Sequence, residues 1–181
     1  MKNSVKFTAI GALVAGSLLI APSAFADDVV QTVTAGERTA SVANITLGAV
    51  ATSHAAASSV GSLTLNADDS TGSGAGWNVT QIVTDLAPTP AMVSAGATVI
   101  PAAGITATIG AVSSTAGQDA TGVTPTAGAV ALNVETTVLS AAAQSGMGTY
   151  TAPVALAVAI PANTYAGAYT GTLTTTISSA P

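Results

Sequence analysis

The chain has 181 residues, of which 49% are apolar and only 6% are charged, and it contains no cysteine. An average protein carries about 25% charged residues, and disordered chains combine high charge with low apolarity, the reverse of this balance. The few basic residues argue against nucleic-acid binding. The lack of cysteine excludes disulfides, thiolate metal sites and thiol catalysis.

Residues 1–26 are predicted to be a secretory signal peptide. Lys2 and Lys6 precede an apolar stretch at 7–20, and residues 24–26 (Ala-Phe-Ala) have the small-x-small pattern of a cleavage site. The alternative is a membrane anchor that is retained. The small-residue cleavage pattern favours removal of the segment, so we expect an exported protein with no membrane attachment after cleavage.

Cleavage would leave residues 27–181 as a single domain of common size. This part of the chain has one arginine, Arg38, against eight acidic residues, which gives a net charge of −7. Its surface must therefore be solvated mainly by Thr, Ser, Asn and backbone groups. We expect secretion to the medium or non-covalent retention at the cell surface.

Short strands separated by Gly- and Pro-containing turns are predicted along this domain. The clearest is 154–160, in which large apolar residues alternate with alanine at period two. Residues 168–178 also alternate, with Thr and Ser on one face, and we expect these two segments to form an antiparallel pair that closes a sandwich. In chain order, the other expected strands are 29–33, 40–50, 62–66, 76–84, 105–112 and 129–135.

The connections between these strands are expected to be loops, with one helical turn each at 55–57 and 141–143. The predicted loops are 67–76, 87–96 and 113–128, and the last is expected to be mobile because it is long and rich in Gly, Ser and Thr. The pattern as a whole predicts an all-β fold, a single antiparallel β-sandwich of the Ig-like or jelly-roll-like kind. We expect it to have seven to nine short strands.

The residues needed for catalysis are scarce. His54 is the only histidine, and the G-x-S-x-G motif of serine hydrolases is absent from the sequence. A glycosidase needs two carboxylates held across a bond, and the spacing of the acidic residues does not select a pair. The sequence therefore indicates a protein that is not an enzyme. The candidate carboxylates are those of Asp68, Asp69, Asp85, Asp119 and Glu135.

Asp68 and Asp69 lie in an acidic, glycine-containing stretch that offers oxygen ligands of the kind calcium prefers. The stretch does not match an EF-hand loop, because Thr71 stands at the glycine position and Trp77 at the glutamate position. Acidic turns are more often simply solvated. A calcium site is thus the weaker reading, and we expect no cofactor.

Trp77 is the only tryptophan and begins a predicted strand, with Val79 on the same face. A core position, with the indole N–H bonded to a backbone carbonyl, is the favoured interpretation. A surface binding role is the alternative. Tyr169 is interpreted as a corner tyrosine that ties the last connection to the sheet.

Two segments carry a resemblance to a known family. Residues 69–80 (DSTGSGAGWNVT) contain a Gly/Asp loop that leads into Trp77, and residues 160–177 (IPANTYAGAYTGTLTTTI) form the second segment. Together they resemble the WxL domain of bacterial cell-surface proteins. Against the family pattern, Val79 replaces a leucine, Thr175 replaces the second tryptophan and Ile177 replaces the second leucine.

The resemblance implies a secreted, non-enzymatic protein that attaches non-covalently to the bacterial cell wall through peptidoglycan, or to other surface proteins. It implies that Trp77, Val79, Thr175 and Ile177 are the motif residues and candidates for binding. If the second tryptophan is part of the family's binding surface, Thr175 weakens wall binding. The alternative is a structural subunit that assembles into an extracellular fibre or surface layer by strand pairing, because strands with few charges protect their edges poorly.

Overall fold

The computed structural model describes residues 30–180, so the predicted signal peptide lies outside the described part of the chain. The chain divides into two compact units, Met1–Val33 and Thr34–Pro181. In the first unit, residues 30–33 are exposed and have no regular structure. The strand expected at 29–33 is therefore wrong for its described residues, because a valine-rich stretch forms a strand only beside a partner strand.

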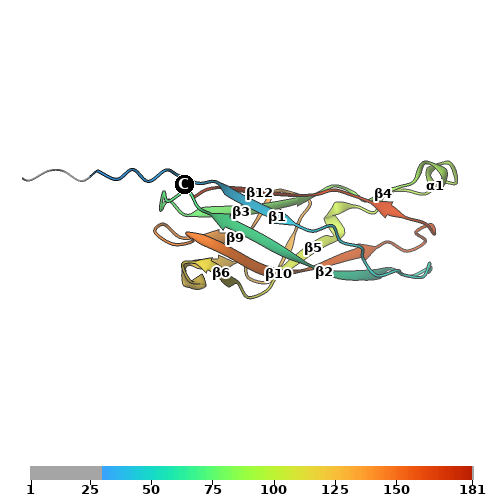
Figure 1. The fold of residues 1–181 in the computed structure, drawn as a ribbon. Helices are drawn as coiled ribbons and strands as arrows, with labels where there is room; N and C mark the ends of the chain where they lie inside the picture. Colours follow the sequence, from blue (N-terminus) through green and yellow to red (C-terminus); the bar gives the residue numbers. More distant parts are fainter. Residues whose placement is uncertain (1–29, 181) are drawn as a thin grey trace, which may run out of the picture. The chain divides into compact units, whose positions relative to one another are not determined.

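The regular structure of the second unit is almost entirely β-strand, and its helices are single turns (Figure 1). The helix α1 covers Pro90–Ser94, and the two 3-10 helices are η1, Ala102–Gly104, and η2, Ala120–Gly122. Among residues 30–180 there are twelve strands: β1 Arg38–Val42, β2 Ala57–Asp69, β3 Trp77–Val83, β4 Ala87–Pro88, β5 Ile105–Ile109, β6 Ser113–Gly117, β7 Val123–Pro125, β8 Ala129–Ala131, β9 Thr136–Ala141, β10 Gly148–Ile160, β11 Tyr169–Thr170 and β12 Leu173–Ser179.

The strands form two main antiparallel sheets and one small one. The first sheet has the order β1-β2-β10-β5-β8, and β6 also pairs with β10. The second has the order β12-β3-β9-β7, while β11 and β4 form a separate pair. The two longest strands, β2 and β10, pair along all thirteen residues of each. The predicted all-β, sandwich-like fold is confirmed, but the expected number of seven to nine strands is wrong, because the described residues form twelve, several of them only two or three residues long.

The core lies between the two main sheets. Inward side chains of the first sheet, such as Leu65 and Val154, share one buried cluster with Val79 and Val138 of the second. Alternate residues of β10 are buried, as period-two alternation predicts for a strand with one face on a core. A smaller cluster of Ile100, Ile105 and Val158 lies apart from this core.

The expected antiparallel pair of 154–160 with 168–178 is wrong. The first segment lies in β10, which pairs with β2 and β5, and the second contains β12, which pairs with β3 in the other sheet. The connection between them therefore passes from one sheet to the other. The expected faces are confirmed, because Leu173, Thr175 and Ile177 are half-buried while Thr174 and Thr176, on the opposite face, are exposed.

The strand expected at 40–50 ends early, at Val42, because the chain then leaves the edge of β2 and passes over its inner face. Ile45 and Leu47 sit beside Gly61, where a side chain on Gly61 would come within 2.8 Å of each. The helical turns expected at 55–57 and 141–143 are also wrong, since Ala57 begins β2 and Ala141 ends β9.

Three predicted loops contain regular structure. The loop expected at 113–128 holds β6, η2 and β7, and the loop expected at 87–96 holds β4 and α1. The first three residues of the loop expected at 67–76 belong to β2. These elements were missed because their residues are small or polar and lack apolar alternation.

Candidate functional site

The two segments of the family resemblance meet on neighbouring strands. In the antiparallel pair of β3 and β12, Val79 is opposite Ile177 and Gln81 is opposite Thr175. Residues about a hundred positions apart in the sequence therefore form one patch. Because Trp77, Val79 and Gln81 are all buried, this patch faces the core and not the solvent.

Trp77 is fully buried, and its indole Nε1 donates a hydrogen bond to the carbonyl oxygen of Gly146 at 2.9 Å. Its ring packs on Tyr150 with centroids 6.0 Å apart and planes tilted by 49°. The core interpretation of Trp77 is confirmed. Val79 is equally buried, so neither side chain presents a surface to a ligand in this structure.

Thr175 points toward the interior, where its hydroxyl accepts a hydrogen bond from Nε2 of Gln81 at 3.2 Å. Gln81 is fully buried, and its Oε1 has no hydrogen-bond partner among the described residues. Ile177, two residues further along β12, packs against the core cluster. All four motif residues therefore act in packing between the sheets.

The acidic stretch at the end of β2 is organised by an ion pair. Nη2 of Arg38 lies 2.9 Å from a carboxylate oxygen of Asp69, and both side chains are nearly buried. The other oxygen of Asp69 accepts hydrogen bonds from the backbone N–H and the hydroxyl of Thr71. Arg38 also donates to the hydroxyl of Ser179 at 2.7 Å, which links β1, β2 and β12 at this end of the sandwich.

Burial acts to raise the pKa of Asp69, but the hydrogen bonds from Thr71 and Arg38 outweigh it and hold the pKa below its usual value. Asp119 caps η2 by accepting a hydrogen bond from the backbone N–H of Thr121, which lowers its pKa. Burial raises the pKa of Tyr150, and the negative charges of Asp119 and Asp69 add to this.

Asp68 and Asp69, the candidate calcium ligands, do not converge. Neighbouring strand residues point to opposite faces, and Asp68 binds the hydroxyl of Thr149 while Asp69 binds Arg38. Within residues 30–180, no three His, Asp or Glu side chains are grouped to hold a metal ion.

The candidate catalytic residues are held in local contacts. Nδ1 of His54 lies 2.7 Å from Oδ1 of Asn163, in an exposed position. The carboxylate of Asp85 accepts from the backbone N–H of Ala102, and that of Glu135 accepts from the hydroxyl of Thr80. Such contacts fix turns and strand ends, and they do not bring a nucleophile to a base.

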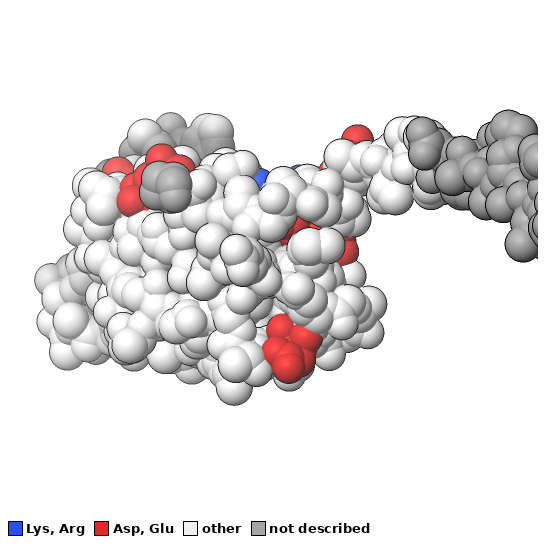
Figure 2. Space-filling view, turned by 90° about the vertical axis from the view of Figure 1, so that its left-hand side faces the viewer, with Lys and Arg blue, Asp and Glu red and all other residues white. Residues whose placement is uncertain are grey.

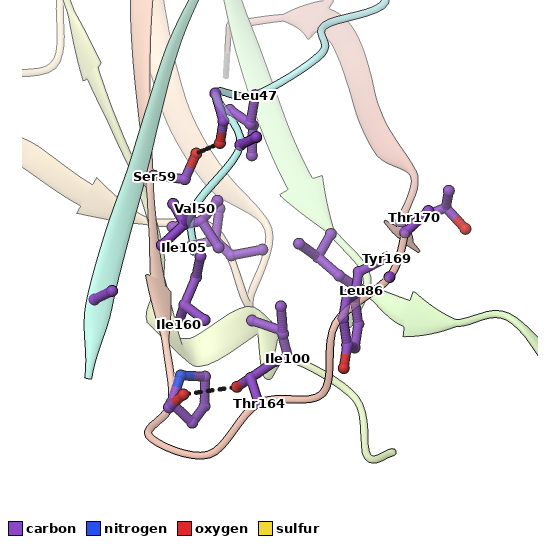
Figure 3. A pocket seen from close by; sticks show the side chains of 18 of the residues that line it. Leu47, Val50, Ser59, Leu86, Ile100, Ile105, Ile160, Thr164, Tyr169 and Thr170 are labelled. Atoms are coloured by element: carbon purple, nitrogen blue, oxygen red, sulfur yellow. Dashed lines mark hydrogen bonds between the residues drawn. The ribbon is translucent and has the colours of Figure 1, made fainter. Parts of the chain in front are cut away.

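A different site lies at the end of the sandwich opposite Arg38, and we call it the end cavity. It has a volume of about 800 Å³, within the usual range for ligand pockets. In Figure 3, Leu47, Ile105 and Ile160 line one side, and Leu86 and Tyr169 line the other. No lining residue carries a charge at neutral pH.

The end cavity exists because the sheets differ in length. β2 and β10 have thirteen residues each, whereas β3 and β12 have seven, so the first sheet extends past the second. The irregular segment 43–56 and the connection 161–168 cover the overhang.

Three hydroxyl groups on the rim donate hydrogen bonds to the backbone of the protein itself. The hydroxyl of Tyr169 donates to the carbonyl of Tyr165 at 3.1 Å, so it ties this connection to β11 as expected of a corner tyrosine. The hydroxyl of Ser59 donates to the carbonyl of Gly48, and that of Thr164 to the carbonyl of Pro161. The ring of Tyr165 is 50% exposed, so it is available to a ligand at the rim.

Sequence reasoning missed the end cavity, because its walls come from five separate segments. The cavity end of β2 gives no apolar signal in the sequence, because its inward-facing residues are Ala57, Ser59 and Gly61. The searches found no match for this chain among protein-family models, curated proteins or solved structures. No helix among the described residues has the length and apolarity needed to span a membrane.

Proposed function

We propose that this chain is a secreted, non-enzymatic protein of the bacterial cell surface that binds wall polymer or another surface protein through the end cavity. The observation that carries the proposal is the end cavity itself, a large, uncharged, mainly apolar hollow with the exposed ring of Tyr165 at its rim. The WxL-like segments and the predicted signal peptide support the cell-surface part of the proposal.

The chemistry of the end cavity favours a ligand without charge. No lining residue carries a charge, and the rim hydroxyls of Ser59, Thr164 and Tyr169 already donate to backbone carbonyls, so a charged ligand would lose its water without gaining an oppositely charged partner. Sugar rings and small side chains such as alanine offer apolar surface that tyrosine and aliphatic residues can cover. Peptidoglycan contains both sugar rings and alanine residues. Trp77 and Val79 contribute to this binding only by supporting the fold.

Co-sedimentation with purified peptidoglycan tests the proposal. We expect the exported protein to pellet with the polymer, and Tyr165→Ser to reduce the bound fraction several-fold. Val134→Ser is the matched control, because Val134 is similarly exposed, at 59%, but does not line the end cavity. Equal binding by both variants would reject the end cavity as the site, and an unbound wild-type protein would reject wall binding.

A structural subunit of an extracellular fibre or surface layer is the second candidate function. The observation that favours it is the edge of β2 at residues 57–64, which has no neighbouring strand among the described residues and lies beside the end cavity.

A further inference from the structure

More than half of β2, eight of its thirteen residues, has a free edge among the described residues. On one side, β2 pairs with β10 along its whole length, but on the other side β1 pairs only with residues 65–69. Residues 57–64 therefore have no strand beside them on that side among the described residues. A strand edge of this kind exposes backbone N–H and C=O groups that can pair with another chain.

This edge lacks the usual protection. Its sequence, ASSVGSLT, has no charged residue and no proline, the two features that most often prevent edge-to-edge pairing. The outer strands of the two main sheets are shorter than the eight free residues of β2: β7 and β8 have three residues each, β1 has five and β12 has seven. Val60, at the middle of the free edge, is 67% exposed.

We propose that residues 30–34 of a second copy of this chain add to the free edge of β2 as an extra strand. The three most exposed large apolar side chains among the described residues are Val33 at 89%, Val30 at 84% and Val60 at 67%. Two of them lie in the donor segment and one lies on the acceptor edge. The donor sequence, Val-Gln-Thr-Val-Thr, is uncharged and dominated by β-branched residues, which favour strands.

The donor segment cannot fill the free edge of its own copy. Gly36 is held at the far end of β2, where its N–H donates to the carbonyl of Ser70. Val30 is six residues before Gly36, so it reaches at most about 21 Å from it. The free edge begins at Thr64, about 20 Å from Ser70 along the strand. Only the tip of the segment reaches that point, so a donor segment that covers the remaining edge comes from a different copy.

Such pairing is head to tail. The donor segment precedes β1 at the Asp69 end of β2, whereas the acceptor edge lies at the Ala57 end. An interface between two different surfaces repeats from copy to copy and gives open chains unless it closes into a ring. The inference rests on the second candidate function, the structural subunit, and it specifies both partners of the strand pair.

Disulfide cross-linking tests the inference directly, because the chain has no cysteine of its own. Val33→Cys and Val60→Cys proteins, made with tags of different size, are mixed and mildly oxidised. We expect the mixed dimer to exceed by at least about fivefold the dimer from Val33→Cys with Val134→Cys, since a disulfide needs Cα atoms within about 7 Å. Thr32→Cys serves as a second donor position, because it faces the opposite side of the strand.

A second measurement uses light scattering of the concentrated protein. We expect the mass of the wild type and of Val134→Lys to rise with concentration, and that of Val60→Lys to stay at one copy, because a lysine on an edge blocks strand addition. A wild type that remains a monomer, or cross-linking from both donor positions no stronger than to Val134→Cys, would overturn the inference. A dominant Val60→Cys homodimer would overturn it in favour of pairing between two β2 edges.

Peptidoglycan binding by Val60→Lys separates this inference from wall binding. A variant that binds the polymer as a monomer shows that the two properties are independent. If Val60→Lys no longer assembles but still binds peptidoglycan, the result supports the strand pair and leaves the proposal of wall binding unaffected.

Discussion

Trp77 joins parts of the chain that are far apart in the sequence. Its ring fills the space between the sheets beside Tyr150, and its N–H satisfies the carbonyl of Gly146 in the turn before β10. A residue in this position stabilises the fold through both packing and a buried hydrogen bond.

Trp77→Ala is expected to lower the free energy of unfolding by about 4 kcal/mol, the usual cost of removing a large buried ring. Trp77→Phe keeps most of the packing and loses the hydrogen bond to Gly146, so we expect a loss of about 1–2 kcal/mol. Urea unfolding followed by circular dichroism measures both, because the fluorescence probe is removed by the substitution. A loss below about 1 kcal/mol for Trp77→Ala would contradict a core role.

Asp69 makes the free energy of unfolding depend on pH in the acidic range. Its pKa is lower in the folded protein than in the unfolded chain, so its contribution is complete above the unfolded pKa, near 4, and is lost as the pH falls through the folded pKa. We expect the free energy of unfolding of the wild type to decrease below about pH 4.

Asp69→Asn should remove much of this acid dependence and should cost about 2 kcal/mol at pH 7, because Arg38 loses its charged partner. Urea titrations at several pH values measure both effects. Glu135→Gln is the surface control, since Glu135 binds the exposed hydroxyl of Thr80. If the free energy of unfolding falls with pH in the same way for Asp69→Asn and the wild type, Asp69 is not the source of the acid dependence.

At the scale of elements, two turn glycines allow the cost of backbone strain to be measured separately from the cost of disturbed packing. Gly146 and Gly128 have nearly the same positive φ, 80° and 77°. A Cβ on Gly146 would lie 2.4 Å from Cβ of Ala141 and 2.6 Å from Nε1 of Trp77, whereas a Cβ on Gly128 would meet nothing within 4 Å.

We expect Gly128→Ala to cost about 1 kcal/mol, the strain of a left-handed conformation in a non-glycine residue. Gly146→Ala should cost at least about 3 kcal/mol, because the same strain is joined by displacement of the buried indole. Thermal unfolding and the emission wavelength of Trp77 report stability and indole environment together. Equal losses for the two variants would show that the turn at Gly146 adapts.

The sequence was enough to predict which face of each strand is buried. It was not enough to predict which strands are neighbours. The alternation in β10 and β12 correctly placed Val154 and Leu173 on inward faces. The same alternation is satisfied by any partner that covers that face, so the expected pairing of the two strands was wrong. The seven residues from 161 to 167 allow a change of sheet as easily as a return in the same sheet.

The position of a single residue, Trp77, could be predicted from the sequence, but the end cavity could not. A lone tryptophan in a chain poor in aromatics favours the core, and Trp77 is buried. The end cavity depends instead on the unequal lengths of two sheets and on where the segment 43–56 crosses. Ser113–Gly117 is exposed along most of its length and pairs with β10 through its backbone, so its side chains carry no strand signal.

At the scale of the whole molecule, the surface carries little charge. The face shown in Figure 2 is mostly uncharged, with acidic groups in separate places. Attraction over long distance therefore contributes little to the meeting of this protein with its ligand.

We expect peptidoglycan binding to change less than about twofold between about 0.05 M and 0.5 M NaCl, because apolar contacts in the end cavity are not screened by salt. Co-sedimentation across this range measures the effect. A steep fall in binding with salt would indicate a charged contact outside the end cavity.

The hydrogen bond between Arg38 and Ser179 places the first and last strands of the sandwich side by side at one end. Leu173 and Ala57, at the other ends of their strands, line or border the end cavity. Any polypeptide joined before β1 or after β12 would thus leave from the same pole of the domain. A circular permutant that joins residues 38 and 179 by a short linker should therefore keep the same fold, because the linker runs at the pole away from the end cavity.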